Sequence, residues 1–503
     1  MRNLIEVSRI VTKKKVRKIE IFDDHTLRHK NSKFNEFYEA LLTNKFKNDR
    51  DAASFLYNCT PTDDKYRQLK SRFRKRLLNT LFFLDVNVPS TSNYDRAYYT
   101  VNKEWTLVKI LLANGAHHTA SAQARQILTT ALKYKFADVI VNCSRILREF
   151  SANENDDKSY EEYDQHIKQY SNVLDAEIRS EELYQRVIMN YYNPPQKSAI
   201  LREKIDIYCD ALVGLSEVYD SPVVTYNMYL VWAFRYEMLH DYEAMLEVCE
   251  KAEKYIEENP MSYQDEKSAT FQIKKMSAYL HLRDYKRGKI NAEKSLKSIP
   301  SGSETWFTFM EYYLLLAFHS ENYVNALAIL DEATMHPKFK KLMGAARDKW
   351  EVYEVYLGYI AESAVDNPIL IQNQKRRNFR SAKFLLDPVL FPKDQRILTL
   401  HMVVAQALFY MERKNFSQVS ERIERLKSYA NRQLKKEEYF RAIQFIRLLQ
   451  QLMKADFKVS ELSNVDKYYA RLHKYPFFYR GLLSELEIIP FEKIWDMILA
   501  KLK

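Results

Sequence analysis

Apolar and polar positions alternate with the period of an α-helix along most of the chain, most clearly between residues 226 and 260. Tyr229, Trp232 and Tyr236 recur there at spacings of three and four residues, and a short turn at residues 240–242 precedes a second stretch of the same kind. Residues three or four apart share one face of a helix, so such large side chains let two helices pack against each other. The stretch therefore predicts a pair of antiparallel helices joined by a tight turn.

The same turn recurs further along the chain. An aromatic residue preceded by Asp or Asn stands at each of five positions, which are Tyr242, Tyr285, Tyr323, Phe379 and Phe416. A helix pair that buries one face and leaves another apolar face uncovered needs neighbouring pairs to cover it. The pattern predicts an all-α fold in which residues 93–474 form a solenoid of helix pairs. Only seven glycines among 503 residues favour the same fold class, because a large sheet needs more of them.

The pattern resembles the tetratricopeptide-repeat (TPR) family, whose units are helix pairs of about 34 residues with small residues at the helix crossings. The best-matching unit has Ala407 and Tyr410 on its first helix and Phe416 at its turn, and another unit has Ala326 and Ala333 on its second helix. The likeness extends over roughly residues 95–460, although the spacing of the turns is less regular than in the family. It implies a right-handed superhelix of antiparallel helix pairs.

In TPR proteins the first helices of successive repeats line a concave groove that holds a peptide or a partner helix. Carried over by alignment, this groove shows Asn227, Phe234, Thr270, Glu311, Phe318, His401 and Leu408. A mixed apolar groove suits an amphipathic helix or an extended hydrophobic peptide. The alternative for each of these residues is a purely structural role in packing.

The positive charge of the chain is concentrated at its N-terminal end. Residues 1–86 contain 20 Lys and Arg against 11 Asp and Glu, a net of +9, whereas the whole chain has a net charge of +12. Residues 1–88 are expected to form a small helical domain, with an additional short helix at 3–12 and a short strand at 19–22. The Pro- and Ser-containing stretch at 88–92 predicts a linker after it.

Short helices are predicted at about residues 34–42 and 50–57, and the third helix, from about Asp64 to Leu84, is strongly basic on its polar face. That face carries Arg67, Gln68, Ser71, Arg72, Lys75, Arg76 and Asn79. Three helices with a basic third one weakly resemble a helix-turn-helix or winged-helix module, whose last helix enters a DNA groove. These side chains are of the types that contact phosphates and base edges. The alternative is a solvated charged face on a bundle that caps the solenoid.

Residues 475–503 are unusually apolar for the end of a chain and include Phe477, Phe478, Ile488 and Trp495. The terminal repeat of a solenoid needs a cover, so this segment is predicted to fold back over the last repeat. A docking surface for a partner is the alternative.

No motif of enzyme chemistry stands out in the sequence. Glycine-rich phosphate loops, nucleophile elbows and spaced metal-ligand clusters are all missing, so no catalytic residue, cofactor or metal is assigned. No apolar run resembles a leader or a membrane span, and the four scattered cysteines are expected to be reduced thiols. These patterns predict a non-enzymatic cytoplasmic scaffold or adaptor that binds a protein partner. The alternatives are a DNA-binding regulator with the repeats as sensor or oligomerisation domain, and an enzyme whose site is assembled from dispersed residues.

Overall fold

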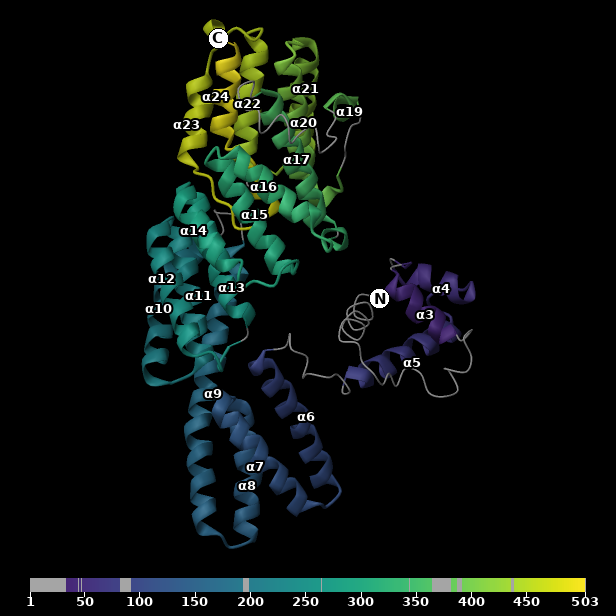
Figure 1. The fold of residues 1–503 in the computed structure, drawn as a ribbon, viewed down its shortest axis with the longest axis vertical. Coiled ribbons are helices and arrows are strands. Elements are labelled where there is room, and N and C mark those ends of the chain that lie inside the picture. The colour runs from purple at the N-terminus through teal and green to yellow at the C-terminus, as the bar shows by residue number, and fades with distance from the viewer. Residues whose placement is uncertain are drawn as a thin grey trace. The chain divides into compact units, whose positions relative to one another are not determined.

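The computed structural model confirms the predicted all-α class: every helix or strand element in its described residues is helical. It describes residues 33–43, 45–46, 48–81, 92–192, 199–263, 265–342, 344–363, 381–386, 391–435 and 438–502. The predicted helix at 3–12, the strand at 19–22 and the repeat turn at Phe379 lie outside these residues. The chain divides into two compact units, Met1–Ser171 and Asn172–Lys503. Figure 1 labels the helices of both units.

Three helices of the first unit pack around a small aromatic core of their own. They are α3 (Lys33–Leu42), α4 (Asp49–Tyr57) and α5 (Asp64–Thr80). Phe37, Tyr66 and Phe73 are fully buried between them, and the rings of Phe37 and Phe73 lie 4.8 Å apart. Asn48 and Asp63 begin α4 and α5 with side chains that accept backbone hydrogen bonds, as Asn and Asp do at helix N-termini.

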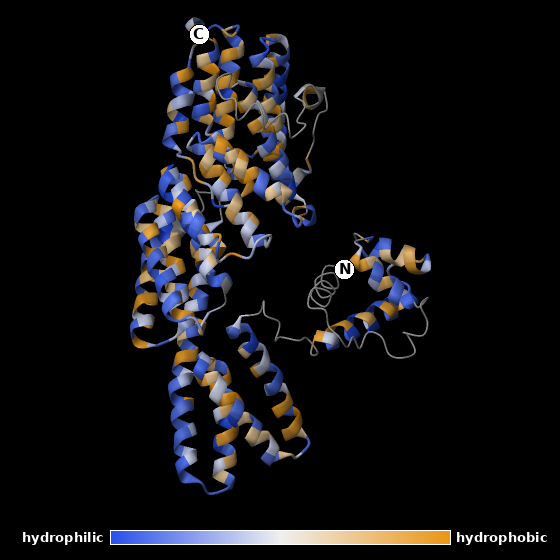
Figure 2. Cartoon of the chain, in the orientation of Figure 1, coloured by the Kyte–Doolittle hydropathy of each residue, from blue (hydrophilic) through white to orange (hydrophobic). Residues whose placement is uncertain are grey.

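A second core in the first unit joins four helices. They are α6 (Asn93–Ala113), α7 (His117–Tyr134), α8 (Ala137–Asn153) and the beginning of α9 (Asp157–Tyr191), which continues into the second unit. Ala120, Ala124 and Ala131 are buried on α7, where small side chains allow the neighbouring helices to approach closely. Figure 2 shows hydrophilic residues over most of the N-terminal half of α9.

The second unit is a succession of helices, most of which pack against the next one in the chain. Their bounds are α10 (Ala199–Val218), α11 (Pro222–Leu239), α12 (Tyr242–Glu258), α13 (Asp265–Leu282), α14 (Tyr285–Ser295), α15 (Glu304–His319), α16 (Tyr323–Met335), α17 (Ala345–Ser363), α19 (Ser381–Leu386), α20 (Arg396–Glu412), α21 (Phe416–Gln433), α22 (Phe440–Lys454), α23 (Val465–Lys474) and α24 (Phe491–Leu502). One continuous hydrophobic core extends through them from Leu183 to Ile498. The helix pairs predicted around Tyr242, Tyr285, Tyr323 and Phe416 are therefore present.

A shared backbone geometry explains why the turn repeats in the sequence. His240, Arg283, Glu321 and Lys414 adopt the left-handed conformation, with φ between 54° and 59°. The amide of the residue after each one donates to the carbonyl five residues earlier, at 2.8–3.1 Å, so each helix ends in a Schellman motif. The Asp or Asn that follows becomes the N-cap of the next helix. Two residues thus end one helix and begin the next without glycine.

The helices α15 and α20 are buried around nearly their whole circumference, unlike a helix that has one solvent face. Every residue from Phe309 to His319 is buried, and so is every residue from Ile397 to Phe409. A helix that is apolar on all sides needs covering elements on all sides. Neighbouring helix pairs cover most of these faces, and the segment between α23 and α24 covers the remainder.

Candidate functional site

The C-terminal strap, defined as residues 475–490, is the least regular part of the second unit. It connects α23 to α24 and contains only a short 3₁₀ turn at Leu483–Glu485. It contacts α13, α15 and α20, each the first helix of a pair, and the side of these helices that faces the strap is called the inner surface below. The helix α24, which follows the strap, packs against α22. The C-terminal segment was predicted to cover the last repeat, and residues 477–487 reach further than that.

His281, at the end of α13, holds the strap through its imidazole ring. Its Nδ1 lies 2.7 Å from the carbonyl oxygen of Ser277, so Nδ1 carries the proton and donates. The Nε2 atom then accepts the backbone N–H of Tyr479 at 3.0 Å. The two hydrogen bonds together require a neutral ring. Burial lowers the pKa of His281 to about 4, which keeps the ring neutral at pH 7.

Two further histidines bind strap carbonyls. The Nε2 of His319 lies 2.8 Å from the carbonyl oxygen of Glu487, and the Nε2 of His401 lies 2.9 Å from that of Leu486. Since a carbonyl only accepts, both nitrogens donate. Burial lowers the pKa of His319 to about 3 and that of His401 to about 4. His281, His319 and His401 are called the strap histidines below.

A buried carboxylate on α15 fixes the middle of the strap. Tyr479 is fully buried, and its hydroxyl donates to Oε1 of Glu311 at 2.6 Å. Glu311 also accepts from the hydroxyl of Tyr353 at 3.1 Å and forms an ion pair with Lys349, both on α17. Burial and the adjacent carboxylate raise the pKa of Tyr479, so its hydroxyl stays protonated and donates.

Two arginines hold residues 480–487 of the strap in place through ion pairs. Arg441, at the beginning of α22, contacts Glu487 at 2.5 Å and Glu492 at 2.8 Å. Arg480 pairs with Glu485, five residues further along the strap. It also donates to the backbone carbonyl oxygen of Tyr191, at the end of α9. Burial raises the pKa of Glu485 and of Glu487 against the opposing influence of their arginines. Such buried ions are stable only because each has a partner.

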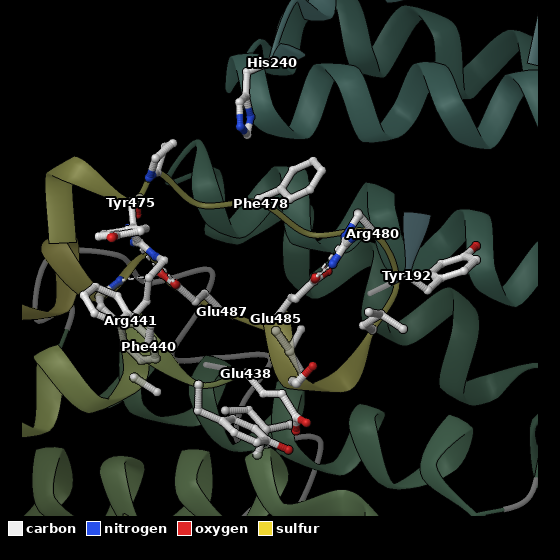
Figure 3. Close-up of a pocket in the computed structure, with 18 of the residues that line it drawn as sticks. Tyr192, His240, Glu438, Phe440, Arg441, Tyr475, Phe478, Arg480, Glu485 and Glu487 are labelled. Carbon is white, nitrogen blue, oxygen red and sulfur yellow. Dashed lines mark hydrogen bonds and ion pairs between the residues drawn. The ribbon is translucent and has the colours of Figure 1, made fainter. Parts of the chain in front are cut away.

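A cavity of about 520 Å³ lies beside the strap within the second unit. Its wall is built from the strap, the beginnings of α10 and α22, and the ends of α9 and α11. Figure 3 shows Phe478 and Arg480 on the strap and Phe440 and Arg441 on α22 around it. The wall combines apolar and aromatic side chains with a few charged ones, a mixture typical of binding sites.

The structure buries most of the residues that sequence comparison assigned to a groove. Asn227, Phe234, Glu311, Phe318, His401 and Leu408 are buried, and Thr270 is half-buried. Asn227 donates to Ser180 at 3.0 Å, and the ammonium of Lys274 lies 4.1 Å from the centre of the Phe234 ring. Glu311 and His401 do lie on the inner surface, where the strap contacts them.

The basic residues predicted on the third N-terminal helix lie mostly on the exposed face of α5. Arg67, Gln68, Ser71, Arg72, Lys75 and Asn79 are exposed. Arg67 forms an ion pair of 3.5 Å with Asp64 on the same helix. Arg76 is half-buried, with its guanidinium 5.2 Å from the centre of the Phe34 ring. Arg74 adds an exposed cation that the predicted polar face did not include.

Sequence reasoning missed the residues that hold the strap. They are His281, His319, Arg441, Tyr479, Arg480, Glu485 and Glu487. One signal for two of them was present, because His281 and His319 each stand four residues before the aromatic residue of a repeat turn. Histidines at that shared register, at the buried ends of two first helices, indicate a polar element packed against them.

Across the described residues no group of three or more His, Cys, Asp or Glu side chains is arranged to hold a metal ion. Each described helix is too short or too polar to traverse a lipid bilayer.

Comparison of the chain with protein-family models, with curated proteins and with solved structures gave no match. The family resemblance of the repeats therefore rests on the turn pattern and the helix pairs alone. What is established is an all-α chain with consecutive helix packing, whose second unit carries a strap across its inner surface and a cavity beside the strap.

Proposed function

We propose that the protein is a non-enzymatic TPR-like scaffold that binds a segment of a partner protein in its second unit, in the cavity beside the strap. The observation that carries this proposal is the strap itself. The inner surface holds an irregular stretch of chain by its backbone, with His281 on an amide and His319 and His401 on carbonyls. A surface that binds one irregular segment in this way has the chemistry to bind another.

The repeated Schellman turns support the TPR-like assignment within this proposal. They place the helices of each pair antiparallel, and the first helices α11, α13 and α15 pack against one another in order. A right-handed superhelix of such pairs gives an inner surface lined by first helices, which is where the strap lies.

A structural use of the buried charged groups supports the non-enzymatic part of the proposal. General acid–base catalysis needs a titratable group with access to a substrate. The perturbed groups of the site, Glu485, Glu487 and the strap histidines, each have a hydrogen-bond or ion-pair partner within the chain. These hydrogen bonds and ion pairs hold the strap in place.

Site-specific photo-crosslinking in cells tests the proposal. The photoreactive residue p-benzoylphenylalanine replaces Tyr192 or Tyr475, which line the cavity and are both 46% exposed. A control variant carries it at Val218, which is 72% exposed at the end of α10. The expected result is one defined protein adduct from the two cavity positions and none from the control. Absence of an adduct at both cavity positions, or the same adducts at Val218, would overturn the proposal.

A second candidate function is nucleic-acid binding by the first unit, and the exposed face of α5 favours it. Arg72, Arg74 and Lys75 are exposed there and form no ion pair with any other described residue. Cations without carboxylate partners are free to replace counterions along a phosphate backbone. The logarithm of the binding constant then falls linearly with the logarithm of the salt concentration, with a slope of about 0.9 per phosphate contact. Gln68 and Asn79 on the same face offer amide groups for base edges.

Fluorescence anisotropy with a labelled DNA duplex at two salt concentrations tests this second candidate. The Arg72→Glu/Lys75→Glu variant is compared with wild type and with Lys251→Glu/Lys286→Glu, which makes the same charge change at exposed positions of the second unit. Loss of binding in the first variant alone supports α5 as the contact surface. Equal weak binding by all three proteins would refute it, because net charge alone explains such binding.

A further inference from the structure

The cavity lies between the strap and the ends of several helices of the second unit. Arg480 and Glu485, which pair at 2.9 Å, line it together with residues at the beginnings of α10 and α22. The volume of about 520 Å³ falls in the range of about 300–1,000 Å³ that binding pockets occupy. The strap therefore leaves a cavity of ligand-binding size open in the second unit.

Aromatic rings form the apolar part of the cavity wall. Tyr475 and Phe478 come from the strap, Phe440 from α22 and Tyr192 from the residue after α9. The rings of Phe440 and Tyr475 lie 4.3 Å apart, and the ring of Phe478 lies 5.0 Å from that of His240. Rings held at such distances favour a further aromatic side chain packed edge to face or offset.

The cavity lining carries one more basic than acidic side chain, with Arg202, Arg441, Lys474 and Arg480 against Glu438, Glu485 and Glu487. Each carboxylate that lines the cavity has a basic partner, in the pairs Glu438–Lys435, Glu485–Arg480 and Glu487–Arg441. The lining residues Arg202 and Lys474 form no ion pair with any residue the structure describes. Complementarity with these two cations requires negative charge on the occupant.

We infer that the cavity is the docking site for an extended segment of a partner protein that carries acidic side chains next to aromatic ones. The strap is the reason to expect a polypeptide: on the adjoining surface it packs Phe477 and Tyr479 against the helices and presents Glu487 to an arginine. The occupant has the same chemistry as the segment that the unit already binds. The inference rests on the proposed function and specifies the partner's chemistry.

Selection from a random library of 12-residue peptides tests this inference on the full-length protein. The library is selected against wild type, and the peptides recovered are measured by fluorescence anisotropy. The expected sequences combine Asp or Glu with Phe, Tyr or Trp. The Arg202→Glu/Lys474→Glu variant is expected to bind them about tenfold more weakly, since both reversals turn attraction into repulsion. Lys251→Glu/Lys286→Glu makes the same charge change away from the cavity and is expected to bind as wild type does.

The outcomes separate this inference from the proposed function. Arg202 and Lys474 are exposed, so their reversal is expected to leave the circular dichroism spectrum unchanged. Recovery of basic or purely apolar peptides, or equal affinity of wild type and the Arg202→Glu/Lys474→Glu variant, would overturn the inference. If the cavity positions still crosslink one partner protein, the scaffold proposal stands and only the partner's chemistry is wrong. If crosslinking also fails, both proposals fall.

Discussion

Removal of the Tyr479 hydroxyl group, which holds the strap to Glu311, is expected to lower the free energy of unfolding measurably. In Tyr479→Phe the ring stays in its fully buried position, and only the hydrogen bond to Glu311, 2.6 Å long, is lost. A hydrogen bond to a charged group contributes about 1.5–3 kcal/mol to stability. Glu311 retains Tyr353 and Lys349 as donors, so its carboxylate is not left without a partner. The lower part of that range, about 1.5–2 kcal/mol, is therefore expected.

Urea unfolding followed by tryptophan fluorescence measures this loss. Four of the five tryptophans, at positions 232, 306, 350 and 495, lie in the second unit, so the emission reports mainly on the unit that carries the strap. The midpoint is expected to fall at an unchanged slope, because the surface exposed on unfolding is the same. Tyr475→Phe is the control, since Tyr475 is 46% exposed, and it is expected to change the stability by less than about 0.5 kcal/mol.

A double-mutant cycle with Glu311→Gln provides the stricter test of the same contact. If Tyr479 and Glu311 interact as described, their substitutions are not additive, and the coupling is expected to be about 0.5–3 kcal/mol. Additive effects, or a Tyr479→Phe midpoint equal to that of wild type, would refute the reasoning about the strap.

Three other predictions concern the packing and the titration of the second unit. Because burial lowers the pKa of the strap histidines to about 3–4, the unfolded chain binds more protons below pH 6.5, and stability is expected to fall as the pH drops from 6.5 towards 4. At pH 5.5 each histidine accounts for roughly 1 kcal/mol, so His401→Gln is expected to reduce the pH dependence of the urea midpoint by about that amount. Gly288→Ala places a Cβ in overlap with Leu316 Cδ2 and is expected to lower stability by about 1–3 kcal/mol, as measured by thermal unfolding. Ala326→Leu and Ala407→Leu overpack buried positions and are expected to cost about the same; an unchanged melting temperature for both would show that the repeat register is wrong.

The sequence was sufficient to predict the helices and their turns because both are local features. The apolar spacing around Trp232 marks a helix, and the Asp or Asn before Tyr242, Tyr285, Tyr323 and Phe416 marks the N-cap of the next one. The preceding left-handed residue was not recognised, since His, Arg, Glu and Lys occupy it instead of glycine. The all-α class and the succession of packed helices follow from these local signals.

The candidate site was not predictable in the same way because its contacts join distant parts of the chain. The strap residue Tyr479 contacts His281 and Glu311, which precede it by 198 and 168 residues. Periodicity shows that the helix of Glu311 is apolar on every side, but it does not say which segment covers that helix. An irregular segment has no period of its own. The apolar residues at 477–491 therefore indicated a cover, but the sequence did not indicate which helices they cover.

Hydrogen–deuterium exchange of the strap tests the central claim most directly. The amide of Tyr479 donates to His281, and residues 477–489 lie against the inner surface or adjoin the residues that do. Peptides from this segment are therefore expected to exchange as slowly as those from α13 and α15, because exchange requires the strap to leave its site. Exchange of residues 477–489 at the rate of an unstructured peptide, with α13 and α15 still protected, would contradict the account.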